Sequence, residues 1–205
     1  MSKIMQKISN VLLGRQNGHQ FILQAIREIS QKDTTKPIRI AEIGIWSGTT
    51  TKHVLKKARQ ITEYIGIDNY PTKYEKLYSR TNLMQKAKQA MKENTKQYLN
   101  FKWINKSSTQ AAKQFPNKYF DIIFIDANHC YKYVKEDIKT WLPKIKEKGI
   151  MCGDDYSITN FGVIQAVNEA FNGKKHIIIN SGMWKITKKS KRKNEQRNKM
   201  FFRKR

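Results

Sequence analysis

The strongest constraint on the fold is a repeated alternation between short apolar runs and longer amphipathic segments. Helical spacing of apolar side chains predicts helices at residues 19–30, 49–60, 71–98, 108–115, 131–145 and 161–171. Short runs rich in β-branched residues predict strands at 38–44, 63–68, 101–105, 120–126 and 148–155. Strands that alternate with helices form a mostly parallel sheet covered on both faces, which is the doubly wound α/β class.

The last apolar segment has a different pattern. Residues 176–187 contain two short strands joined at Asn180-Ser181-Gly182, which is a hairpin signal. The final strand of such a hairpin can insert antiparallel into a parallel sheet. We therefore predict a Rossmann-like sheet whose last strand runs against the others.

The chain carries 41 Lys and Arg residues against 16 Asp and Glu, a formal net charge of +25. Residues 188–205 hold ten of the basic residues and one Glu, which predicts a solvated tail attracted to polyanions such as RNA. A compositional explanation competes with this one, because Lys supplies most of the positive charge. Arg is the residue expected at dedicated phosphate or base contacts.

No apolar run is long enough to span a bilayer, and the N-terminus has no continuous apolar leader region. We therefore expect a soluble, cytoplasmic protein that does not enter a membrane. Cys130 and Cys152 lie in or beside apolar runs. They are expected to be reduced core thiols rather than a disulfide, as suits a reducing compartment.

A glycine-containing turn, AEIGIWSGTT, follows the first predicted strand. Gly44 and Gly48 allow a ligand to approach the backbone near the positive end of the next helix. Trp46 occupies the middle position of a three-glycine dinucleotide fingerprint, and no phosphate-loop ending is present. Glu42 near the first strand end and Asp68 at the second, placed to accept ribose hydroxyls, favour an adenosine-containing ligand. The alternative is a glycine-rich turn with two solvated acids.

With these segments in place, the chain resembles class I S-adenosylmethionine-dependent methyltransferases, in particular the O-methyltransferase-like methyltransferase family 24. The similar segments are EIGIWSG, YIGID, INKSST, FDIIFIDANHCYKYVKEDIKTWLPKIKEKGIMCGDDY, GVIQAVNEAF and the closing hairpin. The resemblance implies a seven-stranded sheet, S-adenosylmethionine as cofactor, and a methyltransferase domain at 36–188. An N-terminal helical segment (1–35) would precede this domain, and a basic, disordered tail (189–205) would follow it.

The resemblance also implies roles for individual residues. Gly44 and Gly48 would border the methionine part of the cofactor, and Glu42 would help to hold its polar end. Trp46, in the same turn, would also contact the cofactor. Asp68 would accept the ribose hydroxyls.

Further along, Ser108 would lie near the adenine, and Asp126 at the fourth strand tip would also border the cofactor. The turn before Ser108 departs from the family's usual Gly-Asp/Glu-Ser, since this chain has Lys106-Ser107-Ser108.

Two neighbouring strands end in carboxylates. Asp126 ends the fourth predicted strand, and Asp154 and Asp155 end the fifth. Carboxylates that meet at one sheet edge repel one another unless they are protonated or bridged by a cation, and Mg²⁺ suits such an oxygen site. Metal-dependent relatives, such as catechol O-methyltransferase-like enzymes, use acids at these places. The predicted metal ligands are therefore Asp126, Asp154 and Asp155; the alternative is that the acidic pair caps the next helix.

His129, three residues beyond Asp126, is the candidate general base because its ordinary pKa lies near working pH. The alternative is that His129 orients Asp126. The Pro-Cys and Asp/Asn-Pro-Pro-Tyr/Phe elements of base methyltransferases are both missing. We predict O-methylation of a hydroxyl on a sugar, glycan or other small acceptor, with Asp126 and His129 as catalytic residues. The alternatives are an RNA-modifying methyltransferase and a non-catalytic binding protein of the same fold.

Overall fold

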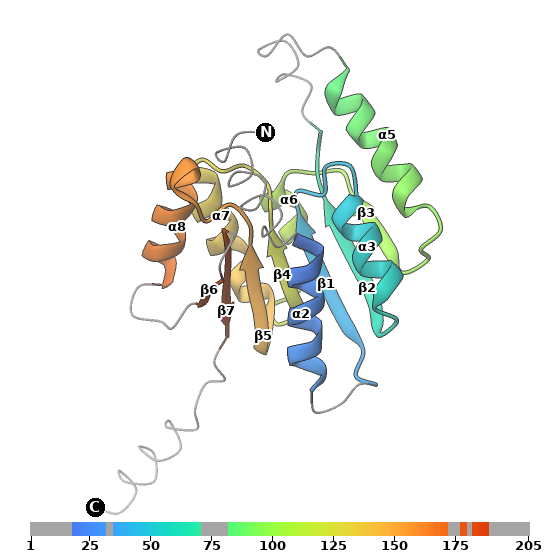
Figure 1. Ribbon diagram of the computed structural model, residues 1–205, viewed down its shortest axis with the longest axis horizontal. Coiled ribbons are helices and arrows are strands. Elements are labelled where there is room, and N and C mark those ends of the chain that lie inside the picture. Colours follow the sequence, from blue (N-terminus) through green and yellow to red (C-terminus); the bar gives the residue numbers. More distant parts are fainter. Residues whose placement is uncertain (1–17, 32–34, 71–81, 172–176, 180–181, 189–205) are drawn as a thin grey trace, which may run out of the picture.

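The computed structural model describes residues 18–31, 35–70, 82–171, 177–179 and 182–188, which form one sheet with helices around it (Figure 1). The strands are β1 (Ile38–Ile43), β2 (Ile61–Ile67), β3 (Phe101–Ile104), β4 (Phe120–Ile125), β5 (Ile145–Gly153), β6 (Ile177–Ile179) and β7 (Met183–Thr187). The helices are α2 (Gly18–Ser30), α3 (Thr49–Lys57), α5 (Leu83–Thr95), α6 (Ser108–Ala112), α7 (Tyr131–Trp141) and α8 (Phe161–Phe171), with 3₁₀ turns η1 (Leu142–Lys144) and η2 (Ile158–Asn160).

The sheet has seven strands in the order β3-β2-β1-β4-β5-β7-β6. The neighbours from β3 to β5 pair in parallel, whereas β7 pairs antiparallel with both β5 and β6. The predicted fold class and the predicted antiparallel last strand are both confirmed. The hairpin places β7 between β5 and β6, so that β7 continues the hydrogen bonding of the sheet.

Apolar side chains cover both faces of the sheet. Along β4, Ile122 and Phe124 point to the layer that contains α2 and α3. Ile123 and Ile125 point to the layer that contains α6, α7 and α8, where Trp141 is fully buried. A strand buried on both faces reads as a continuous apolar run, as the sequence of β4 does.

Several element boundaries differ from the predicted ones. Pro143 ends the helix predicted at 131–145 early, since α7 stops at Trp141 and residues 142–144 form the 3₁₀ turn η1. A proline inside a helix removes a backbone donor and clashes with the preceding turn. Strand β5 therefore begins at Ile145 rather than 148, and Ile145 pairs with Phe120 before a shift in register.

Parts of four predictions fall outside the described residues. These parts are 71–81 of the helix predicted at 71–98, 176 and 180–181 of the hairpin, 1–17 and 32–34 of the N-terminal segment, and the tail 189–205. None of the helices that the structure describes is long and apolar enough to cross a membrane. The domain limits and the basic tail stay predictions.

The cysteine prediction is half right. Cys152 on β5 is buried, whereas Cys130 is exposed, and both are free thiols. Cys130 is not in the core because it is the residue immediately before α7, in the loop that follows β4.

A buried ion pair fixes α2 to the sheet. The Lys185 Nζ on β7 lies 2.6 Å from a carboxylate oxygen of Glu28 on α2, and Lys185 is only 5% exposed. A buried ammonium without its partner loses its solvation and gains nothing in return. This pair therefore sets the position of α2 against the last strand of the sheet.

We expect the substitution Glu28→Gln to lower the free energy of unfolding by about 2–3 kcal/mol, because it leaves the Lys185 charge without its carboxylate. The double variant Glu28→Gln with Lys185→Met keeps the aliphatic stem and removes the charge, so it should recover most of the loss. Urea unfolding followed by tryptophan fluorescence measures both. Equal losses in the single and double variants would contradict the ion-pair explanation.

Candidate active site

A cavity of about 470 Å³ opens where the carboxyl ends of β1, β2 and β4 meet. Ligands of doubly wound sheets bind at this edge, just beyond the strand ends. The cavity brings together five of the sequence-predicted site residues: Gly44, Trp46, Asp68, Ser108 and Asp126.

Gly44 allows an unusually close approach between two strand ends. Its φ is +89°, and a Cβ at this position would lie 2.1 Å from the carbonyl oxygen of Asp126. The Asp126 amide donates to the carbonyl of Ile43 at 2.8 Å, so the loop after β4 lies directly against the turn after β1. Gly48 precedes α3 with φ +70° and packs against Met91, and it does not line the cavity.

Asp68 holds the turn around Trp46. Its two carboxylate oxygens accept the backbone N–H groups of Trp46 at 3.1 Å and Tyr70 at 3.0 Å. The buried Tyr70 hydroxyl donates to the Trp46 carbonyl at 2.5 Å. These bonds stabilise Trp46 at φ +45°, a conformation uncommon for a non-glycine residue, while its indole remains 44% exposed and lines the cavity.

Burial raises the pKa of the Asp68 carboxyl, while its backbone donors lower it. The carboxylate nevertheless borders the cavity, where a ribose hydroxyl could reach it.

Glu42 lies beneath the cavity rather than in its lining. It is 1% exposed, and one carboxylate oxygen accepts the hydroxyl of Thr51 at 2.5 Å and that of Tyr64 at 2.6 Å. The pKa of Glu42 is raised to about 7, chiefly by burial; the hydroxyls of Thr51 and Tyr64 oppose the increase, and the charges of Asp126 and Asp68 add to it. The predicted contact of Glu42 with the cofactor stays a prediction.

Ser108 lines the cavity, but its hydroxyl is already engaged. It accepts the indole N–H of Trp141 at 2.7 Å and donates to the carboxylate of Asp137, which also lines the cavity. Burial raises the pKa of Asp137 to about 6. Asp137 was not singled out in the sequence, although an acid on the buried side of a helix between Val134 and Trp141 is an available signal.

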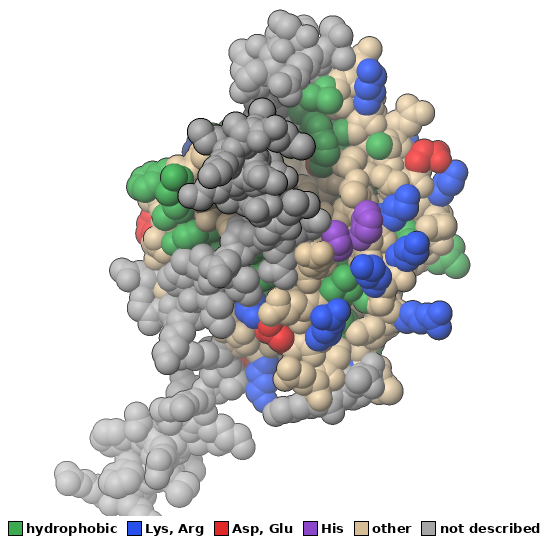
Figure 2. Space-filling model, in the orientation of Figure 1, with side chains coloured by type: hydrophobic (Ala, Val, Ile, Leu, Met, Phe, Trp, Pro, Cys, Tyr) green, Lys and Arg blue, Asp and Glu red, His purple; other side chains and the backbone are tan. Residues whose placement is uncertain are grey.

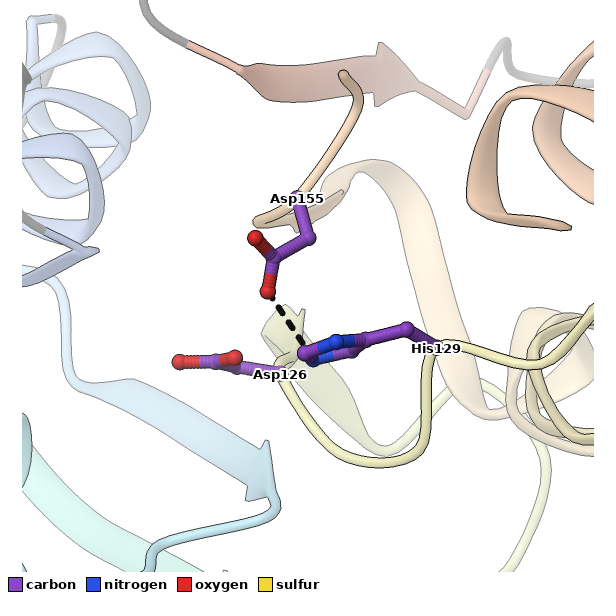
Figure 3. Close-up of side chains that lie close together, drawn as sticks. All are labelled: Asp126, His129 and Asp155. Atoms are coloured by element: carbon purple, nitrogen blue, oxygen red, sulfur yellow. Dashed lines mark ion pairs between the residues drawn. The ribbon is translucent and has the colours of Figure 1, made fainter. Parts of the chain in front are cut away.

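Asp126, His129 and Asp155 each point one side-chain donor atom into the same small space, and these atoms all lie within 4.8 Å of one another. Figure 3 shows the origin of the group: Asp126 and His129 come from the loop after β4, and Asp155 comes from the loop after β5. The Nε2 atom of His129 lies 2.8 Å from an Asp155 oxygen. The loop after β4 therefore supplies two donors and the loop after β5 supplies one.

The two neighbouring carboxylates Asp154 and Asp155 have different partners, and only Asp155 belongs to this group. Asp155, at φ +61°, turns its carboxylate toward His129 and accepts the Asn160 side-chain N–H at 2.9 Å on its other oxygen. Asp154 accepts the Asp155 backbone N–H at 2.7 Å and is not part of the group. The structure therefore groups His129, rather than Asp154, with Asp126 and Asp155.

The hydrogen bond to Asp155 raises the pKa of His129, and burial opposes it. The negative charges of Asp155, Asp126 and Asp154 add to the increase. A raised pKa means that His129 keeps its proton to a higher pH than an ordinary histidine. Any cation bound among these carboxylates would reduce that increase.

The sheet order, the antiparallel β7 and a cavity at the carboxyl edge define a class I methyltransferase fold. Similar solved structures include the O-methyltransferase NovP, with a TM-score of 0.65 and 15% identity over 84% of this chain and 79% of NovP. A candidate caffeoyl-CoA O-methyltransferase from Staphylococcus aureus has a TM-score of 0.59 and 16% identity over 92% of this chain and 93% of that one. A candidate O-methyltransferase from Klebsiella pneumoniae has a TM-score of 0.58 and 14% identity over 93% and 91%. No curated protein sequence matches the chain.

The family profile described as a methyltransferase domain, methyltransferase family 24, matches residues 41–156. This match spans more than half of the 205 residues, from β1 to the residue after Asp155. The chain belongs to this family and is an S-adenosylmethionine-dependent methyltransferase. The predicted resemblance and enzyme class are thereby confirmed.

The buried Glu42 makes stability depend on pH. Its folded-state pKa of about 7 lies above the ordinary value of 4.5, so the folded protein binds a proton that the unfolded chain releases. The stability that Glu42 gains by binding this proton is fully present below about pH 4.5. It is lost as the pH rises through about 7. Relative to Glu42→Gln, the wild type should lose about 3 kcal/mol of stability between about pH 5 and pH 8.

Urea unfolding of both proteins at the two pH values measures this difference. Glu93→Gln is the matched control, because the Glu93 side chain is 63% exposed on α5 and its replacement should leave the pH dependence unchanged. A constant difference between wild type and Glu42→Gln would show that Glu42 is ionised at both pH values.

Proposed function

We propose that the enzyme transfers the methyl group of S-adenosylmethionine to a hydroxyl of a small, uncharged acceptor such as a sugar or glycan, assisted by a divalent metal ion. The observation that carries this proposal is the convergence of Asp126, His129 and Asp155 beside the cavity. Methyl transfer to a hydroxyl requires that the hydroxyl be aligned and that one proton be removed. The three side chains supply groups suited to both tasks.

The cavity fits the cofactor that the family uses. The turn after β1 has no side chain at Gly44 that would block the backbone, and Asp68 presents a carboxylate toward the cavity. Four carboxyl groups and one lysine are among the lining residues: Asp68, Asp126, Glu136, Asp137 and Lys106. This excess of negative charge suits the sulfonium cation of S-adenosylmethionine, which supplies the methyl group.

The donor set of Asp126, His129 and Asp155 fits a divalent metal ion that accepts oxygen and nitrogen ligands. The donor atoms lie close enough to surround one ion, and three protein ligands leave other positions for water or substrate. Such an ion lowers the pKa of a bound hydroxyl and fixes its position. Mg²⁺ remains our proposed ion, although the histidine nitrogen in the group also suits Mn²⁺ or Fe²⁺.

The negative lining argues for an uncharged acceptor. A phosphate of RNA would meet the carboxylates of Asp126, Glu136 and Asp137, and like charges at this range disfavour binding. The exposed aromatic side chains that line the cavity, Trp46 and Tyr133, offer apolar faces to a ring-shaped acceptor. These two observations favour a sugar or other small acceptor over the RNA alternative.

His129 is positioned to hold the proton that the acceptor hydroxyl releases. Its ring bonds to Asp155 at 2.8 Å, which fixes the orientation of the imidazole and stabilises its protonated form. As a metal ligand, His129 would instead be neutral and could not hold that proton, so the two roles of His129 are alternatives.

Calorimetric titration of S-adenosylmethionine should give a Kd for the wild type and a Kd about 10–100-fold weaker for Asp68→Asn, because a charge-assisted pair of hydrogen bonds is lost. Glu136→Gln is the matched control, since it removes one charge from the same cavity without touching the proposed ribose contact. Equal weakening by both variants would assign the effect to cavity charge alone. Unchanged binding in Asp68→Asn would exclude the ribose role.

Titration of Mg²⁺ or Mn²⁺ into protein saturated with S-adenosylhomocysteine tests the metal group. Asp126→Asn and Asp155→Asn should each weaken metal binding at least about tenfold. Asp154→Asn is the control, because asparagine retains an oxygen to accept the Asp155 N–H. A loss in Asp154→Asn as large as in Asp155→Asn would favour the ligand set predicted from sequence, and no binding to wild type would exclude metal assistance.

A further inference from the structure

Basic side chains are unevenly divided between the two helical layers. Helices α2, α3 and α5 carry two acidic residues and seven basic ones: Arg27, Lys52, Lys56, Lys57, Lys86, Lys88 and Lys92. Helices α6, α7 and α8 carry three basic and three acidic residues. A lysine-rich composition would load both layers alike, so composition alone does not explain this difference.

Helices α3 and α5 lie against each other and carry six lysines, which we call the basic face: Lys52, Lys56, Lys57, Lys86, Lys88 and Lys92. The two helices are joined at Lys52, whose Nζ donates to Asn94 on α5 at 3.0 Å. Figure 2 shows Lys and Arg side chains gathered over this side of the molecule. The face is adjacent to the cavity, because Met84 on α5 lines it.

A groove of about 450 Å³ runs between α5 and the edge strand β3, next to the basic face. Lysines at the end of α5 line one side, and aromatic residues in and before β3 line the other: Lys92 and Lys96, and Tyr98, Phe101 and Trp103. The Nζ of Lys92 lies 5.9 Å from the centre of the Trp103 ring. The groove therefore combines aromatic surface with positive charge in one concave site.

A pair of histidines lies between α2 and α3, next to Lys57 of the basic face. The rings of His19 and His53 stack with their centres 4.8 Å apart. Burial lowers the pKa of His19, and the charges of His53 and Lys57 lower it further.

We propose that the basic face and the groove beside it bind single-stranded nucleic acid. Lysines along α3 and α5 would neutralise backbone phosphates, and bases would stack on the aromatic side chains of the groove. Proteins that bind single strands without sequence preference combine these two features. The surface is a docking site, and the proposal does not make nucleic acid the methyl acceptor or depend on the O-methylation proposed above.

The groove favours nucleic acid over an anionic membrane. A lipid surface meets a protein across a broad area and inserts several apolar side chains. Among the described residues, Leu99 is the one large apolar side chain on the α5–β3 side that is largely exposed; Ile158 and Phe161 belong to η2 and α8. A shallow groove lined by aromatic side chains and lysines instead offers stacking surface and positive charge, the two features that bind a single strand.

Fluorescence anisotropy with the full chain and a labelled oligouridine of about 20 nucleotides, longer than one site, tests the proposal. The test variant combines Lys56→Gln, Lys88→Gln and Lys92→Gln. The matched control combines Lys113→Gln, Lys132→Gln and Lys139→Gln, which removes the same charge from exposed positions outside the face. Circular dichroism melting of all three proteins checks that the substitutions leave the fold intact.

Each lost phosphate contact lowers affinity for a single strand about fivefold at about 0.1 M salt, so the test variant should bind roughly 100-fold more weakly. The slope of log affinity against log salt concentration should become less steep by about 2 for the test variant. The affinity of the control variant should stay within about threefold of the wild-type affinity. Equal losses of affinity in the test and control variants, or no loss in either, would overturn the proposal. Any affinity for the oligonucleotide would then come from the net charge of the protein or from the tail. Tighter binding to a duplex than to the single strand would overturn the single-strand assignment. Binding to anionic vesicles that is as tight as binding to the oligonucleotide, and that the test variant also loses, would overturn it too.

Discussion

The absence of a side chain at Gly44 is the constraint on which the site depends. The two central strands, β1 and β4, end side by side, and only a glycine lets the carbonyl of Asp126 lie against the turn that follows β1. This contact places the Asp126 side chain between two regions with different tasks. On one side lies the turn held by Asp68, and on the other lies the pair formed by His129 and Asp155. In the reaction that we propose, methyl donor and acceptor would meet between these regions, so a backbone contact would set the geometry of the reaction.

Much of the fold could be predicted from sequence because its determinants are local. The run FDIIFI reads as a strand buried on both faces, and the hairpin before Met183 correctly predicted the antiparallel strand. The strand tips also located the carboxylates, since parallel strands align their ends. What could not be predicted depends on distant partners. Glu42 reads as a strand-tip acid, but Thr51 and Tyr64 bury it with their hydroxyls. Asp155, rather than Asp154, turns toward His129 because of its positive φ, which neighbouring residue types do not specify.

The electrostatics of the molecule differ sharply between neighbouring regions. The cavity is lined mainly by carboxyl groups, whereas the adjacent α3 and α5 are lysine-rich and the α7–α8 side is balanced. Such separation fits the two kinds of ligand that we propose for this small domain. A cationic cofactor would be attracted to the cavity, and a polyanion would be attracted to the surface beside it without entering. Net charge alone, at +25, conceals this division.

The buried carboxyl of Glu42 links the cavity to the proton concentration of the surroundings. Near neutral pH this group is shared between its neutral and ionised forms, and the charges of Asp68 and Asp126 favour the neutral one. A sulfonium cation bound in the cavity would act in the opposite direction and favour ionisation. Cofactor uptake would therefore be coupled to release of a fraction of a proton, by the reciprocity that governs any two linked equilibria. The heat of binding then includes the ionisation enthalpy of whichever buffer receives that proton.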